Sequence, residues 1–184
     1  GEPRIGSLSW VFPSGATISL SHLQYEKNVY DWMGAQVPLI CFDELTHFSQ
    51  TQFFYLLSRN RSTSGVRPYV RASCNPDPDS WLAKFLEWWI DQETGLPIPE
   101  RAGVLRWMLR DGDDVLWFAS SQESRAANLE RFGEDRPGKS VTFIPAKLED
   151  NKILMQHDPK YANRLRGLGN ETLVRAWLDG DWSV

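Results

Sequence analysis

The sequence has few residues that could crosslink the chain, coordinate a metal or anchor it in a membrane. It contains two cysteines, Cys41 and Cys74, each in a short apolar run, which excludes a disulfide framework and fits a reducing compartment. The three histidines have no metal-ligand spacing, either with one another or with the cysteines. There is no signal peptide, and no apolar run is long enough to cross a bilayer. We therefore expect a soluble, intracellular protein.

An excess of positive charge is also lacking. The net charge of −4 excludes a wholly basic protein that coats nucleic acid, but it leaves room for a local basic groove. Hydrophobic residues make up 41% of the 184 residues, which favours one globular domain that spans residues 1–184. The nine tryptophans include Trp81, Trp88 and Trp89, whose helical spacing is more typical of a core than of a surface that stacks bases.

Strand-like and helical segments alternate along the chain, which favours an α/β fold with a mostly parallel sheet flanked by helices. The continuous apolar run at residues 37–42 is typical of a strand buried on both faces. Ser49 is a plausible N-cap of the helix that follows, and residues 69–74 form the next strand-like run. Turn residues divide two further pairs of runs, which predict added β-hairpins at residues 8–20 and 104–119.

The strongest local signal is the pair of acids, Asp43 and Glu44, at the end of the apolar run L-I-C-F. In nucleotide hydrolases, a first carboxylate at such a strand end holds Mg²⁺, and a second polarises the attacking water as general base. The carboxyl ends of parallel strands are where α/β folds bind ligands. The alternative is a strand that simply ends in a solvated acidic turn.

A second signal, S-C-N-P, also ends a short apolar run and contains Ser73 and Asn75. An amide at the tip of a neighbouring strand could sense a γ-phosphate or orient water, because it both donates and accepts hydrogen bonds. Asn-Pro is by itself a common turn. Two strand tips with a helix between them are more informative than either motif alone.

Residues 133–140, G-E-D-R-P-G-K-S, match the phosphate-loop pattern G-x-x-x-x-G-K-[ST] letter for letter. A phosphate loop needs a strand before it and a helix after it, so that the helix N-terminus faces the phosphates. Here a polar helical stretch precedes the motif, and a β-branched run closed by proline follows Ser140. We therefore expect a surface loop.

The order of these features resembles the ATPase domain of the terminase large subunit of tailed bacteriophages. Six stretches carry the resemblance, in the family's order: G-A-Q-V-P-L-I-C-F-D-E-L-T-H-F (34–48), L-L-S-R-N-R-S (56–62), R-A-S-C-N-P (71–76), F-I-P-A-K-L-E-D-N (143–151), Y-A-N-R-L (161–165) and L-D-G-D-W (178–182). No single stretch is decisive, but their ordered combination is quite specific and spans nearly the whole chain.

The resemblance implies a partial P-loop NTPase core of the RecA-like (ASCE) type, with ATP and Mg²⁺ as cofactors. Asp43 would be the Walker B magnesium acid and Glu44 the catalytic base. Asn75, together with Ser73, would couple hydrolysis to DNA movement. The implied partners are double-stranded viral DNA, the portal protein, the small terminase subunit and further copies in a ring, all in the host cytoplasm, for a phage or prophage protein absent from the mature virion.

Two departures from the family pattern matter. The family's phosphate loop should precede Gly1 and is absent, so we expect this chain alone to be inactive as an ATPase. The G-D-W ending resembles the junction before a nuclease domain, which would lie beyond Val184. An arginine finger is not obvious either. Arg59 and Arg61 could bind the nucleotide phosphates, because planar guanidinium suits phosphate. They could equally contact DNA backbone or form a solvated helix end.

Two alternatives in other classes stay open. The missing phosphate loop fits a catalytically silent fragment that docks on DNA or on the portal. A nuclease would need carboxylates from several strand tips that converge on two metals, and the sequence shows one convincing pair.

Overall fold

The computed structural model describes residues 2–4, 6, 8–167 and 169–184. Where the sequence predicts a single domain, contacts within the chain group it into two compact units, Gly1–Cys74 and Asn75–Val184. The division falls inside the S-C-N-P motif. Each unit is therefore described by itself.

The first unit begins with a small antiparallel sheet. It contains β1 (Glu2–Arg4), β2 (Ser9–Val11) and β3 (Thr17–Ser19), in that order. In the turn between β2 and β3, the amide of Gly15 donates to the carbonyl of Phe12 at 2.9 Å. The hairpin predicted for residues 8–20 is confirmed.

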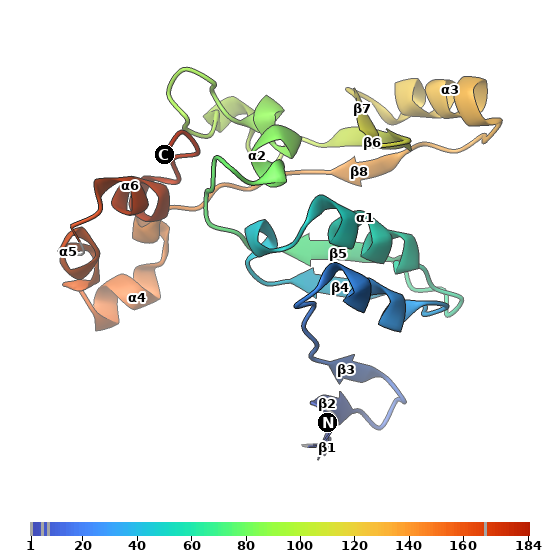
Figure 1. Ribbon diagram of the computed structural model, residues 1–184, viewed down its shortest axis with the longest axis horizontal. Coiled ribbons are helices and arrows are strands. Elements are labelled where there is room, and N and C mark those ends of the chain that lie inside the picture. The colour runs from blue at the N-terminus through green and yellow to red at the C-terminus, as the bar shows by residue number, and fades with distance from the viewer. Residues whose placement is uncertain (1, 5, 7, 168) are drawn as a thin grey trace. The chain divides into compact units, whose positions relative to one another are not determined.

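The second part of this unit is a parallel pair of strands, β4 (Leu39–Phe42) and β5 (Tyr69–Ala72). Parallel strands need a crossover connection, which is supplied by η3 (Leu45–His47) and α1 (Gln50–Arg59). Ser49 and Gln52 cap α1 reciprocally, as the N-cap prediction requires. Helix α1 covers one face of the strand pair (Figure 1), where the rings of Phe42 and Phe53 lie 5.5 Å apart. The 3-10 helix η2 (Glu26–Trp32) packs beside α1.

Two expectations about this sheet are wrong for the described residues. Leu39 and Tyr69, which face each other in register, are 44% and 45% exposed, so β4 is buried on one face only. Apart from β4–β5, the strand pairings among the described residues are antiparallel, so the sheets are not mostly parallel. An apolar run predicts a strand but does not say how many neighbours cover it. The mixed α/β class itself is confirmed.

The second unit is built around a three-stranded antiparallel sheet in the order β7-β6-β8. Its strands are β6 (Arg106–Asp111), β7 (Asp114–Phe118) and β8 (Lys139–Val141). The hairpin predicted between residues 104 and 119 is confirmed as β6–β7. Helix α3 (Ser121–Phe132) lies over this sheet (Figure 1), and Arg131 pairs with Asp111 at 2.9 Å.

Aromatic side chains form the core next to this sheet. They come from α2 (Trp81–Phe85) and η4 (Glu87–Trp89). Trp89 is 1% exposed, and its ring lies 5.6 Å from that of Trp117 on β7. The core interpretation is therefore confirmed for Trp89, whereas Trp88 is only half-buried.

The remainder of the second unit is helical. It contains η5 (Pro99–Arg101), η6 (Leu148–Asp150), α4 (Lys152–His157), α5 (Tyr161–Arg166) and α6 (Glu171–Asp179). Asn151 and Asn170 cap α4 and α6 with their side-chain oxygens. Among the described helices, none combines the length and the apolar character that crossing a bilayer requires.

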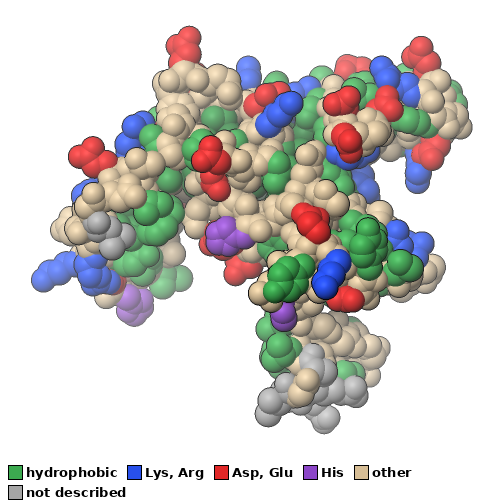
Figure 2. Space-filling view, in the orientation of Figure 1, with side chains coloured by type: hydrophobic (Ala, Val, Ile, Leu, Met, Phe, Trp, Pro, Cys, Tyr) green, Lys and Arg blue, Asp and Glu red, His purple; other side chains and the backbone are tan. Residues whose placement is uncertain are grey.

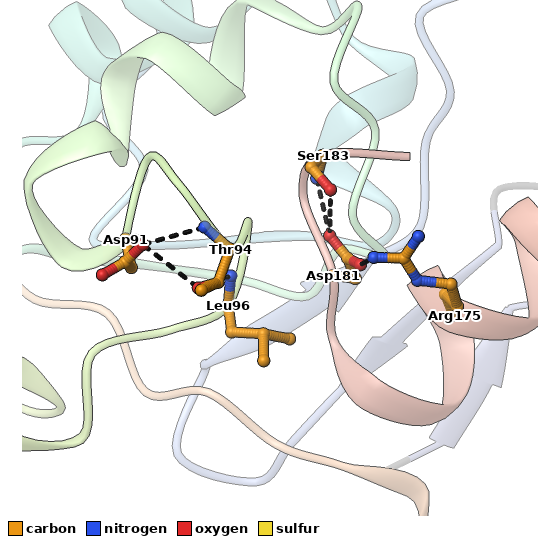
Figure 3. A network of polar contacts seen from close by, with 6 residues as sticks. All are labelled: Asp91, Thr94, Leu96, Arg175, Asp181 and Ser183. Carbon is orange, nitrogen blue, oxygen red and sulfur yellow. Dashed lines mark hydrogen bonds and ion pairs between the residues drawn. The ribbon is translucent and has the colours of Figure 1, made fainter.

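Polar contacts hold the last described residues against the loop after η4 (Figure 3). We call the contacts of Asp181 and Gly95 described below the clasp. Asp91 shapes that loop by accepting hydrogen bonds from the amide and hydroxyl of Thr94. Asp181, 1% exposed, accepts from Arg175 and from the amide and hydroxyl of Ser183. The two sides meet at Gly95, whose carbonyl accepts from the amide of Trp182 at 2.8 Å.

We predict that Gly95→Ala destabilises the protein. Gly95 has φ +72°, and an added Cβ would lie 2.3 Å from Oδ1 of Asp181. The left-handed backbone costs an alanine about 1–2 kcal/mol, and the overlap should add roughly 1–3 kcal/mol. Urea unfolding measures the loss. Gly103→Ala is the matched control, because Gly103 has φ +75° and open space around it. Equal losses in the two variants would contradict the clasp.

Candidate functional site

The candidate site lies where β4 and β5 end side by side. The last paired residues are Phe42 and Ala72, so the next residues, Asp43 and Ser73, emerge at the same edge. The ladder continues past the strands, because the amide of Ser73 donates to the carbonyl of Phe42 at 3.0 Å. The amide of Leu45 then donates to the carbonyl of Ser73 at 2.8 Å. Backbone hydrogen bonds therefore fix the two strand tips against each other.

The hydroxyl of Ser73 joins the two acids. It donates to Oδ1 of Asp43 at 2.7 Å and accepts from the backbone amide of Glu44 at 3.2 Å. Both distances are within hydrogen-bonding range. Asp43 and Ser73 are exposed, and Glu44 is half-buried. The structure thus brings together three of the residues that the sequence singled out.

Glu44 has a backbone conformation that is uncommon for a residue with a side chain. Its φ is 55° and its ψ is 61°, in the left-handed region. Such a conformation costs about 1–3 kcal/mol and persists only where the surroundings impose it. Here the amide of Glu44 is held by Ser73 and the following amide, of Leu45, by the carbonyl of Ser73. Strain of this kind clusters at functional sites, which makes Glu44 a functional candidate on backbone geometry alone.

Asn60 holds the opposite end of the strand pair. Its side-chain amide nitrogen lies 3.0 to 3.1 Å from the carbonyl oxygens of Val37, Pro38 and Tyr69. The side chain is 7% exposed. Two of these carbonyls directly precede β4, and the third belongs to the first residue of β5. Asn60 therefore fixes the register of β4 against β5, and this register determines which residues meet at the other end of the pair. The sequence analysis gave Asn60 no role, and its only signal was its place within L-L-S-R-N-R-S.

Arg59 and Arg61 lie at that same far end, away from the acids. The carbonyl of Arg59 accepts from the amide of Val37 at 3.0 Å, and its guanidinium lies 5.2 Å from the ring centre of Tyr55. Arg61 donates to the carbonyl of Gly34. These contacts are those of a helix end, so the structure does not bring either arginine to Asp43.

Beyond Ser73 the chain passes through Cys74 into the second unit, which begins at Asn75. Asn75 is exposed and is described with that unit. Burial, and to a smaller extent the charge of Glu44, raise the pKa of the Cys74 thiol to about 11. The sequence analysis did not predict this raised pKa, because the sequence shows only a cysteine in a short apolar run.

One family model matches nearly the whole chain. The family model described as "Terminase large subunit, T4likevirus-type, N-terminal" matches residues 2–183. The chain belongs to this family. Terminase large subunits act in the packaging of phage DNA. No curated protein and no solved structure matches the chain.

In this terminase chain, the phosphate-loop pattern at residues 133–140 is a connection between a helix and a strand. Gly133 ends α3 with φ 71°, and Lys139 opens β8. A Cβ on Gly138 would lie 2.2 Å from the carbonyl oxygen of Met108, so this glycine lets the loop press against β6. No helix begins at Ser140, and the expectation that the motif is a loop without phosphate-loop context is confirmed.

The raised pKa of Cys74 predicts slow alkylation of this terminase thiol. In a Cys41→Ser background, Cys74 should react with iodoacetamide slowly at mildly alkaline pH, because only the thiolate attacks. Glu44→Gln removes a negative charge that disfavours the thiolate, so the pKa should fall and the rate should rise severalfold. The exposed Glu26 provides the control variant, Glu26→Gln. If both variants react alike, Glu44 and Cys74 do not interact in solution.

Proposed function

We propose that this chain contributes the Walker B half of the ATPase site of a viral DNA-packaging motor. The observation that carries the proposal is the hydrogen-bonded group of Asp43, Glu44 and Ser73 at the carboxyl ends of two parallel strands. Ligands of α/β folds bind at this edge. In the full-length protein, the motor would couple ATP hydrolysis to the movement of double-stranded DNA into the procapsid.

In this proposal Asp43 would hold Mg²⁺, which would supply positive charge to offset that of the nucleotide phosphates. The donor set fits a hard cation, because the carboxylate of Asp43 and the hydroxyl of Ser73 are oxygen groups. Among the described residues, no three His, Cys, Asp or Glu side chains gather as a metal site. Mg²⁺ commonly uses one or two carboxylates and takes its other ligands from water and phosphate.

Glu44 is the proposed general base. Its left-handed backbone turns the chain immediately after Asp43. The bond from its amide to Ser73 holds this turn in place. The carboxylate of Glu44 would orient the attacking water and accept its proton. Asn75, which follows Ser73 by two residues, would couple the state of the strand tips to the second unit.

The remaining roles belong to the same proposal. A P-loop NTPase core of the RecA-like type would be completed by a phosphate loop from elsewhere in the protein. The assembled motor would be a ring of copies that contacts the portal protein and the small terminase subunit in the host cytoplasm. Arg59 and Arg61 have no assigned role in nucleotide binding within this unit, because their contacts lie at its other end.

We predict that Glu44→Gln in the full-length protein keeps ATP affinity within about twofold and lowers kcat by roughly 10²–10⁴, the usual contribution of a general base. Equilibrium nucleotide binding and phosphate release measure the two quantities. Glu130→Gln, an exposed acid on α3, is the matched control. Unchanged turnover in Glu44→Gln would sink the catalytic assignment. Absence of turnover in the unaltered protein would favour the alternative of a silent fragment that docks on DNA or the portal.

A separate prediction concerns the loop at residues 133–140. Lys139→Ala should leave the affinity for ATP unchanged, because Lys139 opens a strand and does not precede a helix. Isothermal titration of the full-length protein with ATP measures this affinity. Abolished nucleotide binding would mean that the loop is a phosphate loop after all.

A further inference from the structure

Three cations lie on one face of the sheet in the second unit. Side chains alternate along a strand, so Arg106, Met108 and Arg110 share a face of β6. Lys139 on β8 pairs with Met108 and therefore points to the same side. Directly opposite and diagonal neighbours in a sheet are within reach of long side chains. The cations consequently form a group around Met108.

Two tryptophans extend this group. The guanidinium carbons of Arg101 and Arg106 lie 4.7 and 4.9 Å from the ring centre of Trp88. Arg106 also lies 5.7 Å from the ring centre of Trp117. All three distances are within the roughly 6 Å range of cation–π contacts. The order Arg101, Trp88, Arg106, Trp117 is thus an alternation of positive groups and aromatic rings.

Within this group, Arg101 and Arg106 repel each other. Partial burial, and next the charge of Arg101, lower the pKa of Arg106, and the carboxylate of Glu123 acts in the opposite direction to a smaller extent. Partial burial, and next the charge of Arg136, lower the pKa of Lys139. Within the described part of the chain, Arg101, Arg106 and Lys139 form no ion pair. Arg110, also on this face of β6, pairs with Asp113, as Arg125 pairs with Asp135 and Arg164 with Asp158. An anion bound from outside would relieve this repulsion.

The surface around this group carries charges of both signs. The chain as a whole has a net charge of −4, and Figure 2 shows Lys and Arg interspersed with Asp and Glu over the part that holds β6, β7, α3 and β8. Arg101 uses one donor on the carbonyl of Trp88, at 2.7 Å. A guanidinium has five donors, so most of its donors remain available for an external acceptor.

We propose that Arg101, Arg106 and Lys139, with Trp88, form a contact surface for the phosphate backbone of nucleic acid. This proposal rests on the DNA-packaging role of the family for the identity of the polyanion. Cations interleaved with aromatic rings suit a nucleic acid, because the cations meet phosphates and the rings offer flat surfaces to bases and sugars. An acidic protein would use the charges but would have no need of the exposed part of Trp88.

The test is DNA binding by the chain in the absence of nucleotide, so that loss of this contact and loss of hydrolysis are read separately. Anisotropy of a labelled duplex is measured between about 50 and 200 mM salt. The double variant Arg101→Gln, Arg106→Gln should weaken binding about tenfold at the lowest salt and reduce the slope of log K against log salt by about two. The matched control is Arg125→Gln, Arg164→Gln, which removes the same charge from arginines held in ion pairs elsewhere.

Three outcomes would overturn the proposal. The control variant could lose as much affinity as the double variant, which would mean that net charge alone decides binding. Polyglutamate could compete as well as DNA at equal charge, which would identify an acidic protein as the partner. The salt slope could stay unchanged. A shifted tryptophan emission would reveal that Arg106→Gln prevents folding. In that case the single variants Arg101→Gln and Lys139→Gln replace the double variant, and each should change the salt slope by about one.

Discussion

The parallel pairing of β4 with β5 is the constraint on which the candidate site depends. Asn60 fixes the start of this pair through three backbone carbonyls, and the amide of Ser73 extends the ladder past its end. Four paired residues separate the two ends. Because the strands are parallel, any slip in register would move Ser73 away from Asp43 and leave the amide of Glu44 without its acceptor. A buried side chain far from the acids therefore controls their geometry.

The sequence allowed the strand tips to be predicted because each tip combines a local pattern with a polar residue. An apolar run followed by Asp43 and Glu44, and another followed by Ser73, suffice to place three side chains at one edge. The capped helix between them was also predictable, since Ser49 and Gln52 form a local motif. Both hairpins followed from turn residues. In all these cases the sequence pattern that allowed the prediction is local.

What could not be predicted depends on contacts between distant residues. The exposed face of β4 is one case, because a run of apolar residues looks the same whether one or two layers cover it. The left-handed backbone of Glu44 and the raised pKa of Cys74 are others, because they require the turn, the burial and the charge in three dimensions. The clasp between Gly95 and Asp181 joins residues far apart in the chain. Such a contact leaves no periodic pattern in the sequence from which it could be predicted.

The S-C-N-P motif has a further significance once the two units are separated. Ser73 holds the acids of the first unit and Asn75 opens the second, so Cys74, the last residue of the first unit, is the single residue between Ser73 and Asn75. Cys74 is half-buried, and its thiol has a pKa sensitive to Glu44. A change in charge at Glu44 would therefore shift the pKa of a thiol on the last residue of the first unit. The backbone at Ser73 is hydrogen-bonded on both its amide and its carbonyl, to Phe42 and Leu45, which ties this segment to the strand tip that carries the acids.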